Sequence, residues 1–209
     1  LAGINKLHLI TRDSDVELSA AILGVDFLEE FSMEKLETAP VRLSFSTAKL
    51  NVDDVTTYVP AMKMFDGIIS ANLEGSGTFN ELSVKNFNID YNNTSLKANG
   101  VLKNLLDTEK MSFDLHVTDS YIDPTDPNKF LRELELPEYV EFGIIKIDTL
   151  TYFGGPLEFK TTFAIRTDKG NLNGTANLNM RSPDMIYDAT LITSNLDIGP
   201  FTSISTDLN

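Results

Sequence analysis

The sequence contains no cysteine and no tryptophan, only two histidines, and far fewer basic than acidic residues. Without cysteine, disulfides, thiolate nucleophiles and cysteine-ligated metal sites are excluded. His8 and His116 each stand alone in an alternating segment, without the partner that a general base or a metal ligand needs. A glycosidase requires a defined pair of carboxylates, and the many acidic residues single out no pair. An enzyme is therefore not expected, and neither is a cofactor or a metal.

The formal net charge is −14, from 17 basic and 31 acidic residues. Such a surface repels phosphates and anionic headgroups, so nucleic acid is not an expected partner. The sequence also has no apolar run of membrane-spanning length, and its first residue is Leu1 rather than methionine. We interpret the chain as an excerpt from a longer polypeptide, with any membrane anchor outside it.

Most of the chain alternates apolar and polar residues with period two, which is typical of strands with one buried face. The clearest run is Leu172–Met180, where asparagine or threonine fills the alternate positions. Strands are expected at residues 4–10, 15–22, 41–50, 68–79, 82–91, 95–102, 111–117, 157–165, 172–180 and 187–195. The phase slips near Asn86, which indicates a bulge. Short polar turns separate several of these runs, so the sequence predicts an antiparallel all-β meander.

Helical signals are few. Residues 25–37 have apolar side chains at helical spacing, with Asp26 as the expected cap. Residues 126–134 begin with Asp-Pro, which favours a capped helix start, and 54–64 predict a third short helical turn. Oxygen ligands are close together in 123–128, but the spacing lacks the glycine and distal glutamate of a calcium loop, and helix capping by Asp126 explains it better.

An Asp-x-x-x-aromatic pattern recurs at intervals of about seventy residues, each time after an alternating strand. The three pairs are Asp54 and Tyr58, Asp126 and Phe130, and Asp197 and Phe201. Gly67-Ile-Ile and Gly75-Ser-Gly are echoed by Gly143-Ile-Ile and Gly154-Gly. We expect a short helical plug once per repeat, its aspartate capping the turn and its aromatic docking on the sheet. The expected divisions are 1–40 (the end of a preceding repeat), 41–112, 113–186, and 187–209 (the start of another).

Several stretches resemble the TamB/AsmA-like superfamily of diderm bacteria, particularly its Bacteroidetes-type members. They are residues 50–60 with Phe65-Asp-Gly67, residues 73–79, residues 163–172, and the ending Tyr187-Asp-Ala-Thr-Leu191…Asn195-Leu-Asp-Ile-Gly-Pro-Phe201. Ala189 replaces the family's usual glycine. The resemblance covers most of residues 40–205, and its motifs are structural rather than catalytic.

The resemblance implies a sheet curled into an open apolar groove, called a β-taco, that carries phospholipid or another acyl-chain lipid. It also implies a location in the periplasm, an inner-membrane anchor outside this chain, and an Omp85-type outer-membrane barrel as partner through other parts of the protein. The family is linked to phospholipid transport and outer-membrane assembly. The residues expected to line the groove are Phe87, Ile89, Tyr91, Met111, Phe113, Leu115, Val117, Leu157, Phe159, Phe163, Ile165, Leu172, Leu178 and Met180.

The residue pattern has a second interpretation, because an apolar groove and a sealed β core share the same period of two. The pattern alone favours the sealed core, and the resemblance favours the groove. The alternative function is a closed structural or adhesive β module of a surface protein, without lipid cargo.

Overall fold

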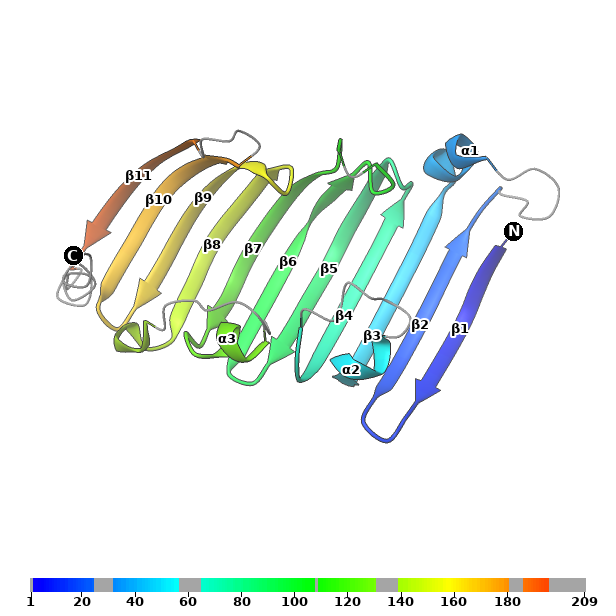
Figure 1. Cartoon of the computed structure of the whole chain (residues 1–209), viewed down its shortest axis with the longest axis horizontal. Coiled ribbons are helices and arrows are strands. Elements are labelled where there is room, and N and C mark those ends of the chain that lie inside the picture. Colours follow the sequence, from blue (N-terminus) through cyan, green and yellow to red (C-terminus); the bar gives the residue numbers. More distant parts are fainter. Residues whose placement is uncertain are drawn as a thin grey trace.

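The chain was analysed as a computed structural model, which describes residues 2–24, 32–56, 65–107, 109–130, 139–180 and 186–195, with backbone only for 2–5. Eleven antiparallel strands form one sheet in which each strand pairs with its neighbours in sequence (Figure 1). The strands are β1 (Ala2–Ile10), β2 (Asp15–Ile22), β3 (Val41–Asn51), β4 (Ile68–Gly77), β5 (Glu81–Tyr91), β6 (Thr94–Lys103), β7 (Ser112–Ile122), β8 (Ile145–Gly154), β9 (Glu158–Thr167), β10 (Gly170–Asn179) and β11 (Ile186–Ser194). The two outer strands, β1 and β11, lie at opposite ends of the sheet, which is open (Figure 1). The predicted antiparallel meander is confirmed.

Short helices lie at both edges of the sheet, where strands end. They are α1 (Met33–Thr38), α2 (Val52–Val55), α3 (Asp126–Phe130) and the 3₁₀ helix η2 (Val140–Phe142). In Figure 1, α1 lies at the upper edge, and α2 and α3 lie at the lower edge. The expected cap at Asp26 lies outside the described residues. Ser32 caps α1 instead, since its Oγ accepts a hydrogen bond from the backbone N–H of Lys35 at 3.2 Å.

The other two helical predictions hold only in part of their range. Helix α3 spans Asp126–Phe130, and the remaining expected residues, 131–134, lie outside the described part. Helix α2 starts earlier than expected, at Val52, because Asn51 caps it by accepting from the N–H of Asp53 at 3.1 Å. Residues 57–64 lie outside the described part.

Bulges keep the apolar residues of a strand on one face where the alternation slips. The bulge predicted near Asn86 is confirmed by register shifts between β5 and both of its neighbours. Strand β8 was not predicted. Its pairing with β9 shifts between Ile147 and Thr149, so its apolar residues change from odd to even positions halfway.

The four-strand spacing of the structure follows the repeat in the sequence. The strands β3, β7 and β11 begin at Val41, Ser112 and Ile186, close to the expected divisions. The strands that follow the first two, β4 and β8, end at Gly77 and Gly154, with φ angles of +145° and +135°. A Cβ at either glycine would collide with a backbone carbonyl, that of Glu81 or Glu158. These glycines therefore end equivalent strands for the same steric reason.

Replacing Gly77 with alanine is expected to lower the free energy of unfolding by about 1–3 kcal/mol, because its backbone conformation is rare for side-chain-bearing residues. Gly75 provides a matched control two residues away. A Cβ there would meet the Ser83 carbonyl oxygen at an ordinary 3.5 Å, so Gly75→Ala should be nearly neutral. Urea denaturation of both variants checks this, and equal stabilities would refute the steric explanation.

Candidate functional site

A row of apolar residues crosses all eleven strands on one face of the sheet. Directly paired residues of antiparallel strands point to the same face, so the pairing register identifies the row. Its members, from β1 to β11, are Leu7, Leu18, Phe45, Leu73, Phe87, Ala98, Val117, Leu150, Phe163, Gly174 and Leu191. With ~4.8 Å between strands, this apolar row runs about 48 Å along the sheet.

Eleven of the fourteen expected lining residues lie in strands, on the face that carries the apolar row. Phe87, Val117 and Phe163 belong to the apolar row itself. Eight others occupy alternate positions in the same strands: Ile89, Tyr91, Phe113, Leu115, Phe159, Ile165, Leu172 and Leu178. Met111, Leu157 and Met180 continue the alternation just outside the strand ends, where the N–H of Met180 donates to the carbonyl of Leu157 at 2.7 Å.

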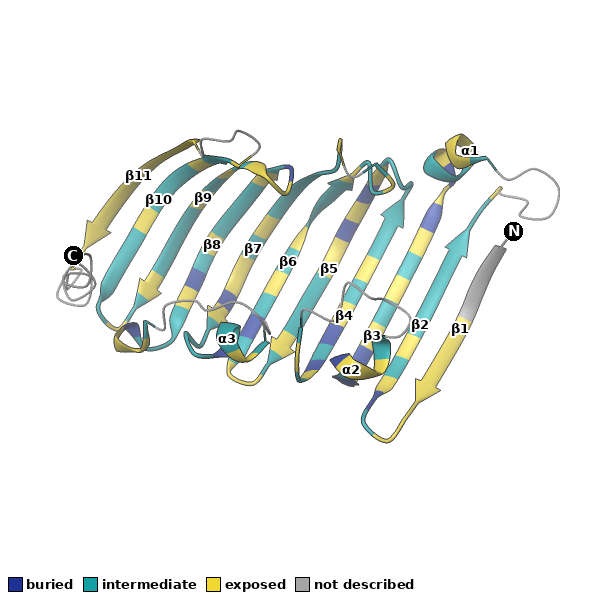
Figure 2. Ribbon diagram, viewed as in Figure 1, coloured by how far each residue is buried: buried dark blue, intermediate teal, exposed yellow. Residues whose placement is uncertain are grey.

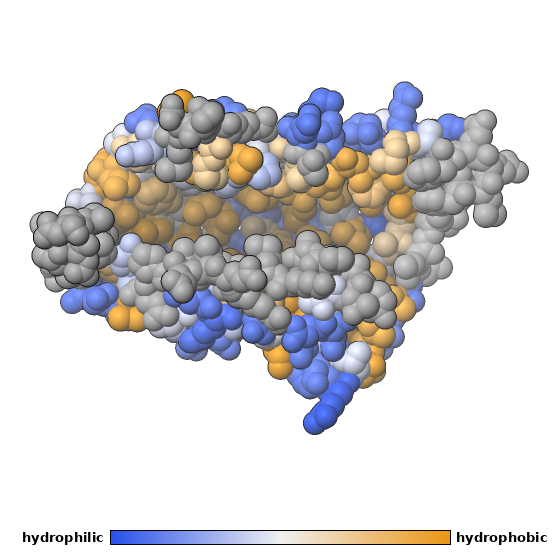
Figure 3. Space-filling model, viewed as in Figure 1, coloured by the Kyte–Doolittle hydropathy of each residue, from blue (hydrophilic) through white to orange (hydrophobic). Residues whose placement is uncertain are grey.

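The apolar face is hollowed and partly open. Figure 3 shows a hollow lined by hydrophobic residues along the sheet. In the middle of the apolar row, Phe87, Val117, Leu150 and Phe163 are only half-buried. Buried residues gather toward the strand ends, and the middle of the sheet is intermediate or exposed (Figure 2). Among the described residues, no second sheet covers this face.

A second row beside the apolar row consists mainly of small residues. From β2 to β11 its members are Ala20, Leu43, Gly75, Val84, Gly100, Leu115, Tyr152, Thr161, Ala176 and Ala189. Five of its ten members are alanine or glycine, which project little or nothing into the hollow. We call the hollow formed by both rows the groove.

The opposite face of the sheet is polar. Thr151, Thr162, Thr175 and Thr190 form a continuous ladder across β8 to β11. Both histidines belong to this face, where the Nε2 of His8 lies 2.6 Å from Asp15 Oδ1 and that of His116 lies 3.6 Å from Asp114 Oδ1. The side chains of both histidines are exposed.

The groove is covered along its lower edge by α2 and α3. Leu50, Val52 and Ile69 form a buried cluster there, against which Phe130 of α3 also packs. The ring of Phe130 lies 4.9 Å from that of Phe65 and 5.0 Å from that of Tyr91, centroid to centroid. Phe130 is the aromatic residue of the Asp-x-x-x-aromatic pattern in this repeat unit, and it docks on the sheet as that pattern predicts. Its counterparts Tyr58 and Phe201, and Asp197, lie outside the described residues.

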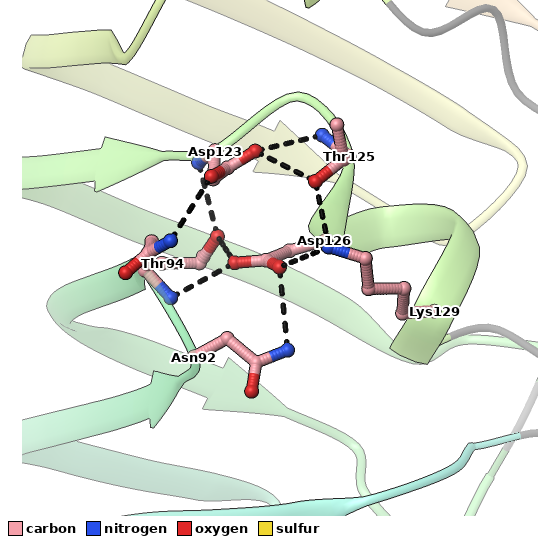
Figure 4. Close-up of polar contacts among 7 residues, drawn as sticks. Asn92, Thr94, Asp123, Thr125, Asp126 and Lys129 are labelled. Atoms are coloured by element: carbon pink, nitrogen blue, oxygen red, sulfur yellow. Dashed lines mark hydrogen bonds and ion pairs between the residues drawn. The ribbon is translucent and has the colours of Figure 1, made fainter.

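The aspartate of the same repeat unit, Asp126, ties α3 to the β5–β6 hairpin (Figure 4). Its carboxylate accepts hydrogen bonds from the N–H of Asn93 and the hydroxyl of Thr94, both at 3.0 Å, and from the Asn92 amide at 3.3 Å. The Lys129 ammonium lies 3.4 Å away. Asp126 is only 2% exposed, so these donors compensate the loss of water around its charge. The sequence predicted only that Asp126 caps the helix. That role does not explain the hydrogen bonds from Asn92, Asn93 and Thr94, which lie more than thirty residues earlier in the chain.

Asp54 makes the equivalent connection in the first repeat unit. Its Oδ2 accepts from the hydroxyls of Ser14, at 2.6 Å, and Thr11, at 2.7 Å, in the β1–β2 turn. Asp54 follows β3 and binds the β1–β2 hairpin, and Asp126 follows β7 and binds the β5–β6 hairpin. Each aspartate therefore binds the hairpin immediately before its own strand. This long-range contact is invisible in the local pattern, since Thr11, Ser14 and Asn92 resemble ordinary turn residues.

The Asp54 contacts predict a pH dependence of stability. Hydrogen bonds from Ser14 and then Thr11 hold the pKa of the Asp54 carboxyl below its ordinary value. A lowered folded-state pKa stabilises the fold above the unfolded-state value of about 3.9. This contribution is lost as the pH falls through the folded-state pKa. Urea denaturation between pH 7 and 2.5 should show a shallower acid decline for Asp54→Asn, and parallel curves would contradict the assignment.

Within the described ranges, no three histidine or acidic residues are placed to hold a metal ion. Asp123 and Asp126, the residues of the calcium alternative, bind Thr125 and the β5–β6 hairpin. None of the helices in the described part of the chain is long and apolar enough to cross a membrane.

No family model, no curated protein and no solved structure matches this chain.

Proposed function

We propose that the groove binds the acyl chains of phospholipid or a similar lipid, and that the chain is a lipid-carrying segment of an envelope scaffold. The observation that carries this proposal is the apolar row, which crosses all eleven strands on a hollowed face and stays half-buried in its middle. A soluble protein seldom leaves a contiguous apolar surface of this length open unless something binds it.

The binding energy would come from hydrophobic burial. Each CH₂ group removed from water contributes about 0.8 kcal/mol, and this contribution needs no directional contact. The apolar row presents a similar environment at every strand, so a chain could slide along the groove without a large barrier. No single polar residue is needed to hold it.

Electrostatic adhesion is not part of the proposal. The net charge of −14 repels anionic headgroups, and the polar face carries many of the acidic residues. Lipid binding should therefore change little with salt concentration, because salt screens charges but does not weaken hydrophobic burial.

The resemblance to TamB/AsmA-like proteins supports a cellular setting for this activity. We place the chain in the periplasm, anchored to the inner membrane by a segment outside it. An Omp85-type barrel would be its partner through other parts of the protein, in phospholipid transport and outer-membrane assembly. Additional four-strand repeats would lengthen the groove.

A vesicle transfer assay tests the proposal. The detergent-free protein is mixed with phosphatidylcholine vesicles containing an acyl-labelled fluorescent lipid, the vesicles are removed by centrifugation, and lipid in the supernatant is measured. Lipid is expected to accompany the protein equally at low and high salt. A supernatant without lipid would contradict the proposal and favour the structural or adhesive module.

A further inference from the structure

A cavity of about 140 Å³ lies between α3 and the apolar face of the sheet. Its apolar wall consists of Ile89, Leu96, Ile122, Pro127 and the rings of Tyr91 and Phe130. Ile89 and Leu96 are paired in β5 and β6, two residues from Phe87 and Ala98 of the apolar row. The cavity therefore borders the groove on its covered edge.

Helix α3 is fixed at both ends, which keeps the cavity from closing. At its start, Asp126 is bound by the β5–β6 hairpin, as described above. At its end, the Phe130 carbonyl accepts from the N–H of Asp66 at 2.8 Å, and the Phe130 ring packs on Tyr91. The helix thus bridges the cavity between two anchored points. The cavity is half open and its wall is almost entirely apolar, so an apolar group that enters it from the groove would lose contact with water.

Water is a poor occupant for this cavity. A buried water needs two to four polar partners. Besides the Tyr91 phenol, the polar side chains in the wall are Thr94 and Asp126, and these two bond to each other and to their neighbours. Thr94 Oγ1 also accepts from the N–H of Asp123 at 3.1 Å. An apolar cavity of ~150 Å³ stays dry and takes a benzene-sized apolar group.

We propose that this cavity binds the terminal methyl and adjoining methylenes of an alkyl chain whose remainder lies in the groove. The inference rests on the proposed lipid-binding function and adds a fixed end point for one chain. It distinguishes the α3 region, where the helix forms a wall opposite the sheet, from the middle of the apolar row.

Intermolecular NOEs locate the chain end directly. Palmitic acid labelled with ¹³C at its terminal methyl is added to the protein, and NOEs from that methyl to the protein's methyl groups are recorded. NOEs to Ile89, Leu96 and Ile122 are expected. NOEs confined to groove residues such as Leu150 would overturn the cavity assignment and leave lipid binding intact. Absence of bound palmitate in the same sample would overturn both.

Filling the cavity provides a second measurement. Ile122→Phe is expected to abolish these NOEs and to weaken palmitate binding about tenfold, the equivalent of roughly two buried CH₂ groups. Ile192→Phe is the matched control, because Ile192 lies on the polar face and is 65% exposed. Unchanged affinity in a folded Ile122→Phe protein would overturn the inference. The wild-type NOEs decide the question if that variant does not fold.

Discussion

Replacing Gly75 with leucine is expected to weaken acyl-chain binding at least about tenfold while the sheet stays folded. Gly75 lies in the row of small residues at the floor of the groove, between Leu43 and Val84. A Cβ there makes only ordinary contacts, the nearest at 3.5 Å, so the backbone tolerates a side chain. The leucine would occupy the volume of at least two lipid methylenes, each worth about 0.8 kcal/mol.

Ser76→Leu is the control for this experiment. Ser76 is the next residue in β4 and therefore points to the opposite face, so the same leucine there leaves the groove open. The vesicle transfer assay measures binding, and thermal melting by circular dichroism verifies the fold. Equal loss of binding in both variants, or in neither, would show that the groove floor is not where lipid binds.

Asp126→Ala is expected to lower the free energy of unfolding by about 2–4 kcal/mol, the largest loss of stability expected of the substitutions considered for this chain. The substitution removes the acceptor of the Asn93 N–H and the Thr94 hydroxyl. Because Asp126 is buried, water cannot easily replace it. At ~2–4 °C per kcal/mol, the melting temperature should fall by roughly 5–15 °C.

Asp54→Ala tests the same position of the repeat in an exposed setting. Asp54 and Thr11 are exposed, so water can replace the carboxylate at the Thr11 hydroxyl, and only the buried Ser14 hydroxyl loses its acceptor without easy access to water. A smaller loss of stability is therefore expected. Differential scanning calorimetry compares the two variants. If Asp126→Ala melts within 1 °C or so of the wild type, the carboxylate does not hold α3 to the hairpin.

The strands were predictable because one-sided burial imposes a period of two. The expected strands at 15–22, 41–50, 82–91 and 95–102 agree with β2, β3, β5 and β6 within one residue at each end. β8 escaped detection because its bulge between Ile147 and Thr149 shifts the apolar residues out of phase. Each half of β8 is too short for its apolar–polar alternation to be recognised, and the two halves alternate in opposite phase.

Helix starts were less predictable, since several polar residues compete to cap a short helix. The sequence pattern pointed to Asp26, which lies outside the described residues, and did not point to Ser32, which caps α1. The roles of Asp54 and Asp126 depended on hairpins about forty and thirty residues earlier in the chain. A local pattern cannot encode such contacts. The recurrence of the aspartates indicated that they mattered, without indicating to what they bind.

The groove depends on register, which links residues that the sequence keeps far apart. The alternation identified Phe87, Val117 and Phe163 as members of one face within their own strands. Only the pairing aligned them with Leu18, Phe45, Leu73 and Leu150, which the sequence did not single out. The openness of the face was equally hidden, because half-buried and buried apolar residues follow the same period.

Photo-crosslinking with phosphatidylcholine that carries a diazirine in its acyl chain tests the central claim most directly. After irradiation, crosslinked residues are identified by mass spectrometry of peptides. Crosslinks are expected at alternate residues of the strands, as at Leu150 in β8 and Phe163 in β9, with their neighbours Thr151 and Thr162 unmodified. Crosslinks to both sets alike, or chiefly to the threonine ladder, would show that lipid does not lie in the groove.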